Sequence, residues 1–204
     1  MTLVELTVSM SMLAIVSVIF LTALASVQRG VNRQTDRTRT NDQARLAVEQ
    51  LDHEIRSGNL LYDPQNETDP DPSHQVVPYM SLRIYTQANA SVRNPGNQCV
   101  QWRITDTGLL QSRRWATTWR SDPGNLVTPW RIVAENVINR DPSVNVRAFS
   151  LDPDPNKGGR TIVVTLMLNT NGKSGQNVKI QESITGRNTE YGYPSTICTD
   201  IPPY

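Results

Sequence analysis

The first 28 residues lack basic side chains, and Glu5 is their only charge. A secretory signal peptide or signal anchor ordinarily carries Lys or Arg ahead of its apolar run, so this segment fits neither pattern. We therefore expect Met1 to be a processed N-terminus from which a basic leader has been removed. The apolar run would then belong to the mature protein.

Histidine, cysteine and aromatic residues are also scarce. His53 and His74 are the two histidines, and neither lies in a nucleophile motif; a Gly-rich phosphate loop is absent too. We expect no enzyme and no cofactor. The net charge of +1 favours neither nucleic acid nor an acidic partner overall. Cys99 and Cys198 have no His at a ligand spacing, which argues against a metal site.

A long helix is predicted at the start of the chain. Residues 6–27 contain no charge, Pro or Gly, and as a helix they span roughly 33 Å, enough to cross a bilayer core. We assign residues 1–28 to this apolar helix, whose small hydroxyl residues suit close helix packing. Residues 29–58 are its amphipathic continuation, which Gly58 and Asn59 end. The apolar face of the continuation carries Ala44, Val48, Leu51 and Ile55, and the opposite face carries Arg45, Glu49, Asp52 and Arg56.

Residues 59–204 read as an antiparallel β domain. Turn signals separate the strand-like runs, and Asp106-Thr107-Gly108 predicts a tight hairpin. The fold class is therefore α+β, with the amphipathic half of the helix packed on an antiparallel sheet. Strands are predicted at residues 76–87, 99–105, 109–115, 131–137, 146–151, 161–168 and 178–185.

The N-terminal residues resemble the signature of type IV pilins and type II secretion pseudopilins. Thr2, Leu3, Glu5 and Leu6 match that signature, Val4 is a conservative variant, and Met1 stands where Phe is usual. The resemblance implies cleavage before Met1 by a prepilin peptidase and methylation of its amine. It also implies a membrane pool that inner-membrane machinery assembles into a cell-surface filament, a homo-oligomer or a mixture with other pilins.

Glu5 is the residue with a mechanistic role in this family. Its carboxylate is thought to meet the N-terminal amine of a neighbouring subunit as that subunit enters the filament. Burying both charges is costly unless they meet in good geometry, so such a pair would set the register of the incoming subunit. The alternative is that Glu5 lies at the membrane interface and reaches water.

Three functions fit this sequence. The first is a filament subunit, and the second is a minor pseudopilin at the tip of a secretion or DNA-uptake machine. The third is a membrane-tethered binding domain that never assembles. Many major pilins have a helix-breaking proline near the position of Thr22; its absence here, and the size of the domain, favour the minor type. We expect a type IV pilin-like filament subunit and leave major versus minor open.

Two further sites are weaker predictions. The loop with Asp63, Glu67, Asp69 and Asp71 is a candidate for Ca²⁺, although it lacks an EF-hand pattern and fits a solvated loop. Basic and aromatic residues interleave between Trp102 and Arg131, as in single-stranded nucleic acid binding. Ordinary strand alternation, with Trp inward and Arg outward, would give the same pattern. The candidate DNA contacts are Arg103, Arg113, Arg114, Trp119 and Arg120.

In an exported domain, the even pair Cys99 and Cys198 predicts a disulfide, which would stabilise the fold by up to ~4.7 kcal/mol in the chain-entropy model. The alternative is two buried free thiols. Mass spectrometry under non-reducing conditions should find the linked peptides, and free thiols at both positions would refute the bond.

Overall fold

The computed structural model describes residues 3–67, 77–87, 96, 98–121, 127–141, 143–144, 146–154, 159–170, 175–187 and 192–203. The chain forms two compact units, Met1–Arg39 and Thr40–Tyr204. The helix and strands of the described part are α1 (Leu3–Arg56), β1 (Gly58–Leu61), β2 (Ser81–Thr86), β3 (Gln98–Ile104), β4 (Leu110–Ala116), β5 (Arg131–Ala134), β6 (Phe149–Leu151), β7 (Thr161–Asn169) and β8 (Asn177–Thr185).

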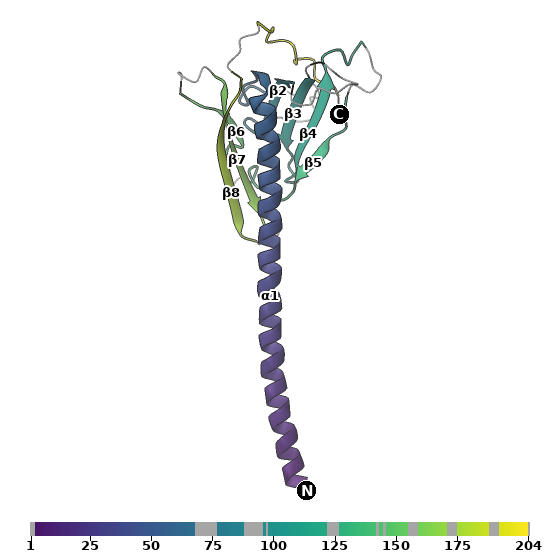
Figure 1. Ribbon diagram of the computed structural model, residues 1–204, viewed down its shortest axis with the longest axis vertical. Helices are drawn as coiled ribbons and strands as arrows, with labels where there is room; N and C mark the ends of the chain where they lie inside the picture. Colours follow the sequence, from purple (N-terminus) through teal and green to yellow (C-terminus); the bar gives the residue numbers. More distant parts are fainter. Residues whose placement is uncertain are drawn as a thin grey trace. The chain divides into compact units, whose positions relative to one another are not determined.

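The helix α1 is continuous over 54 residues (Figure 1). It ends where predicted, because the chain turns at Gly58 directly into β1. A Cβ at Gly58 would lie 2.9 Å from the Ile55 carbonyl oxygen, so a side chain does not fit there. This close approach explains the glycine, and the short strand β1 that follows it was missed by the sequence analysis.

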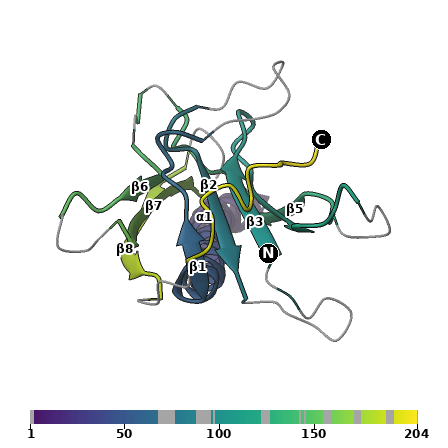
Figure 2. The same cartoon turned by 90° about the horizontal axis from the view of Figure 1, so that it is seen from above.

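The α+β class is confirmed, with two antiparallel sheets in place of the single sheet predicted. One has the order β1-β2-β3-β4-β5 and the other β6-β7-β8 (Figure 2). An isolated bridge between Val137 and Leu168 joins residues near β5 to β7. The predicted hairpin is present: Gly108 has a φ of 78°, and its amide donates to Thr105 O at 3.1 Å.

Three strands are shorter than predicted. Asn136 adopts a positive φ of 59°, and β5 has ended before it, at Ala134. Tyr79 likewise has a φ of 67°, and β2 begins only at Ser81. These left-handed conformations are uncommon outside glycine and interrupt a strand. In the third case only Phe149–Leu151 of the predicted run 146–151 pairs with β7.

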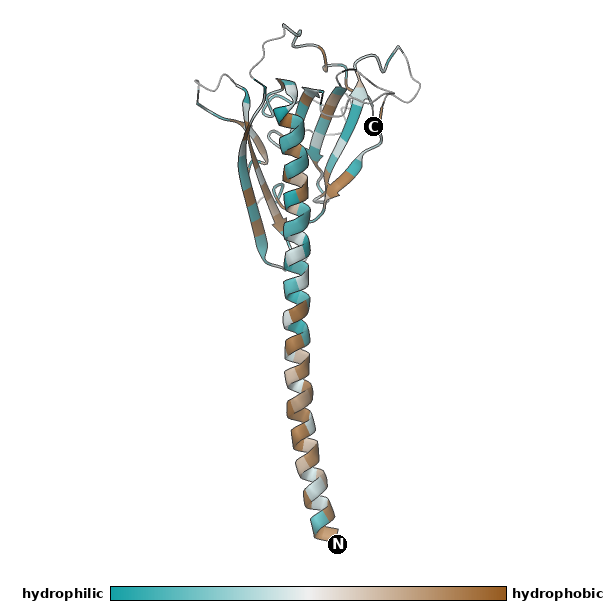
Figure 3. Cartoon of the chain, in the orientation of Figure 1, coloured by the Kyte–Doolittle hydropathy of each residue, from teal (hydrophilic) through white to brown (hydrophobic). Residues whose placement is uncertain are grey.

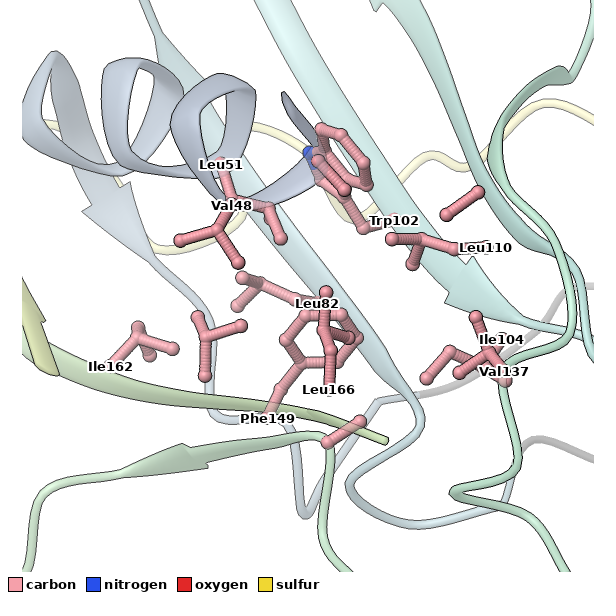
Figure 4. Packing of buried hydrophobic residues seen from close by; sticks show 14 of the residues in the cluster. Val48, Leu51, Leu82, Trp102, Ile104, Leu110, Val137, Phe149, Ile162 and Leu166 are labelled. Atoms are coloured by element: carbon pink, nitrogen blue, oxygen red, sulfur yellow. The ribbon is translucent and has the colours of Figure 1, made fainter. Parts of the chain in front are cut away.

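One core joins α1 to both sheets. The predicted helix stripe is confirmed, since Ala44, Val48, Leu51 and Ile55 are all buried. Figure 4 shows Val48 and Leu51 of the helix together with buried side chains of the β domain. Those that it labels are Leu82, Trp102, Ile104, Leu110, Val137, Phe149, Ile162 and Leu166.

Within that core lies a carboxylate that the sequence analysis did not single out. Glu54 of α1 is fully buried and accepts a hydrogen bond from Trp102 Nε1 at 2.5 Å. Its other oxygen pairs with Arg114 Nη2 at 2.5 Å. Two neighbouring strands, β3 and β4, are thereby tied to one position of the helix. A buried charge left without its partner is strongly destabilising, so this pairing fixes how residues 40–56 lie on the five-stranded sheet.

We expect Arg114→Met to destabilise the chain by about 3–5 kcal/mol, because it leaves Glu54 buried without its cation. Urea unfolding of the detergent-solubilised full chain, followed by tryptophan fluorescence, measures this effect. Arg120→Met is the matched control, since Arg120 pairs with Asp200 on the surface. A loss in Arg114→Met no larger than in the control would contradict the role of the buried pair.

Candidate functional site

The exposed part of α1 is the main candidate site. Every described residue from 3 to 39 is exposed, including large apolar side chains such as Leu13, Ile19 and Phe20, each more than 60% accessible. Figure 3 shows the N-terminal part of α1 as a largely brown, hydrophobic stretch that turns teal further along the helix. The helix contains a segment long and apolar enough to cross a membrane. An apolar surface of this size marks an interaction with a membrane or with other protein chains.

Four hydroxyl side chains between residues 6 and 27 are compatible with an apolar environment. Four hydroxyl groups donate to carbonyl oxygens of their own helix at 2.8–2.9 Å. They therefore bring no unpaired donor into lipid or into a helix bundle. These are the hydroxyls of Thr7, Ser9, Ser11 and Thr22.

Glu5 lies in the first turn of α1. A carboxylate there interacts favourably with the positive end of the helix dipole. Its main-chain oxygen accepts the Ser9 hydroxyl at 2.8 Å. Met1, the predicted site of processing and methylation, lies outside the described residues, so the distance between the two predicted assembly groups is not part of the structure.

The domain carries a second notable feature, a C-terminal segment held across one face of the five-stranded sheet. We call residues 192–203 the strap. The predicted disulfide joins Cys99 of β3 to Cys198 of the strap, with the two Cα atoms 5.8 Å apart. Tyr62 also contacts it, since its hydroxyl donates to Ser195 O at 2.9 Å and accepts from the Cys198 amide at 3.2 Å.

Two buried arginines bind the strap from the sheet. Arg83, Gln101 and Arg113 lie opposite one another on β2, β3 and β4, so their side chains share a face. Arg83 donates to Cys198 O at 2.9 Å, and Arg113 donates to Pro203 O at 3.3 Å. The sequence analysis missed these contacts between the sheet and the strap, because it expected the arginines to face water. Arg113 is only 3% exposed.

The candidate DNA contacts are engaged within the chain. Arg103 lies over the ring of Trp130, 3.8 Å from its centroid, and Arg114 pairs with Glu54. Trp119 Nε1 donates to Asp200 O at 2.9 Å, and Arg120 forms an ion pair with the Asp200 carboxylate. Together with buried Arg113, these side chains hold strands and strap in place. Nucleic-acid contact by them stays a prediction.

An ion pair joins the acidic loop to strand β2. Glu67 pairs with Arg83 at 3.2 Å, with both side chains buried, and burial raises the pKa of Glu67 to about 7 despite that cation. Asp63 accepts hydrogen bonds from Gln65 and Asn66, while Asp69 and Asp71 lie outside the described residues. Among the residues that the structure describes, no group of three His, Cys, Asp or Glu side chains is placed to hold a metal ion.

These features define a pilin-like architecture: a long N-terminal helix, apolar and exposed at first, then packed on antiparallel sheets, with a disulfide that ties down the C-terminal segment. No family model, curated protein or solved structure matches the chain. The description of this chain as pilin-like therefore depends on these structural features alone.

The raised pKa of Glu67 predicts a pH dependence of stability. The folded chain binds this proton more tightly than the unfolded chain, in which the carboxyl has its ordinary pKa of 4.5. The contribution of Glu67 to stability is therefore fully present below pH 4.5 and is lost as the pH rises through about 7. Glu67→Gln should reduce the fall in unfolding free energy between pH 5 and about pH 7.5.

Unfolding curves at a series of pH values test this, with the exposed Glu49→Gln as the control that keeps the wild-type slope. Identical slopes for wild type and Glu67→Gln would contradict the assignment.

Proposed function

We propose that the protein is a non-enzymatic subunit of a type IV pilus-like filament, which polymerises through its apolar N-terminal helix, residues 1–28, after processing by a prepilin peptidase. Its partners are copies of itself or other pilins, together with the inner-membrane assembly machinery. The observation that carries this proposal is the division of α1. Residues 3–39 are all exposed, and the uncharged apolar run 6–27 lies among them, whereas residues further along the helix are buried in the domain. The buried residues are Thr40, Ala44, Ala47, Val48, Leu51, Glu54 and Ile55.

A division of this kind suits a subunit that changes environment. Lipid covers the apolar segment before assembly, and the same segments of other subunits cover it in a filament. Hydrophobic association between helices is weak in lipid, so packing and polar contacts must select the assembled state. Glu5 is the charged group within the apolar segment that can supply such a contact.

The second candidate is a minor pseudopilin at the tip of a type II secretion or DNA-uptake machine. The uninterrupted helix around Thr22 favours it, since many major pilins have a helix-breaking proline near this position. Thr22 donates to Ile19 O at 2.8 Å within regular helix. Both candidates use the same segment for assembly, and they differ in abundance and position within the filament.

Glu5→Ala tests the proposed assembly contact. The variant should remain membrane-inserted and processed, because its helix stays apolar, yet enter filaments at least about tenfold less, as expected for the loss of ~1.4 kcal/mol or more. Immunoblots of sheared filaments and of the membrane fraction measure both quantities. Glu49→Ala, which removes an exposed carboxylate from the domain part of α1, should assemble normally. Normal incorporation of Glu5→Ala into filaments would show that Glu5 does not make the assembly contact.

A further inference from the structure

A basic segment follows the apolar stretch of α1 directly. Residues 29–39 contain four arginines and one aspartate, Asp36, which gives a local charge of 4 − 1 = +3. All of them are helical and exposed. The arginines are Arg29, Arg33, Arg37 and Arg39. This charge stands out in a chain whose net charge is only +1.

The helix geometry places the first two arginines at the surface of a membrane that residues 6–27 would span. With a rise of 1.5 Å per residue, Arg29 lies roughly 3 Å and Arg33 roughly 9 Å beyond Val27 along the helix axis. The headgroup layer on each side of the hydrocarbon core is roughly 5–7 Å thick. The main chain at Arg29 therefore lies within this layer, and that at Arg33 lies just above it.

The side chains point back towards the membrane. Side chains of a helix lean towards its N-terminus, so a long side chain covers the preceding turn. Arg29 shows this directly, since its Nε donates to Ala25 O, one turn earlier, at 3.1 Å. The same lean brings the guanidinium of Arg33 down to about the level of Arg29. The two guanidinium groups then lie near the boundary between the hydrocarbon core and the headgroup layer, within reach of a lipid phosphate.

The positive charges of Arg29 and Arg33 favour the binding of an anion. Arg29 and Arg33 are four residues apart, so they lie on the same side of the helix, where two like charges repel each other. A phosphate between them relieves that repulsion, and the guanidinium fork can bind two phosphate oxygens at once. An anionic phospholipid offers this phosphate with a net negative charge, whereas a zwitterionic lipid adds a competing cation.

We propose that Arg29 and Arg33 bind the phosphate of anionic phospholipids where α1 leaves the membrane, and that this contact fixes the depth of the unassembled subunit. The inference rests on the membrane-inserted state within the proposed function and is independent of filament assembly. Basic groups next to a membrane attract anionic lipid, so both arginines favour the same class of lipid.

Lipid selectivity tests the proposal. The full chain is reconstituted in phosphatidylcholine vesicles with trace spin-labelled phosphatidylglycerol or phosphatidylcholine, and electron spin resonance measures the fraction of each label that the protein immobilises. We expect at least about threefold selectivity for phosphatidylglycerol at low ionic strength, falling towards one in ~1 M salt, where the screening length is about 3 Å.

Two double variants with the same change of charge identify the residues responsible. Arg29→Gln/Arg33→Gln should abolish the selectivity. Arg37→Gln/Arg39→Gln should retain it, because these residues lie roughly 15 and 18 Å beyond Val27. Equal immobilisation of the two lipids by the wild-type chain would overturn the proposal, as would equal losses in both variants. If the chain retains the lipid selectivity but fails to form filaments in cells, the proposed filament function is wrong and the lipid contact is supported.

Discussion

The apolar surface of residues 6–27 is the constraint on which the rest of this protein depends. These residues form a helix without a charge or a break, and every one of them is exposed in the isolated chain. Leaving such a surface in water costs roughly 25 cal/mol for each Å² of apolar area, so it must be covered by lipid or by other chains. Residues 40–56 of the same helix need no such cover, because their apolar side chains are buried against the two sheets of the domain.

The domain holds its helix and its C-terminal strap with charged groups as well as apolar ones. Glu54 fixes the helix to β3 and β4, while Arg83 and Arg113 bind strap carbonyl oxygens on the opposite face of the same sheet. Buried pairs of this kind add little net stability over apolar packing, but an alternative register would leave charges unpaired. The disulfide also holds the strap against the sheet, so a covalent bond and the polar contacts fix the same segment.

Local patterns in the sequence predicted much of this fold. The spacing of Ala44, Val48, Leu51 and Ile55 identified the buried helix face, and alternation with turn residues located seven of the strands. The division into two sheets and the strand β1 were missed, since they depend on pairing between distant segments. The burial of Glu54 could have been predicted, because its position three residues after Leu51 lies within the apolar stripe of the helix. The buried pair of Glu67 and Arg83 had no such signal; the two residues are far apart in sequence and meet only in the folded chain.

We propose that residues 1–28 enter a filament. Mass spectrometry of material sheared from the cell surface, including the N-terminal peptide, tests it most directly. We expect this fraction to contain the chain, beginning at an N-methylated Met1. A dominant amount would indicate a major subunit, and a trace amount a minor one at the tip. Recovery of the chain solely from the membrane fraction, with an unmethylated start, would contradict the claim and favour a tethered binding domain.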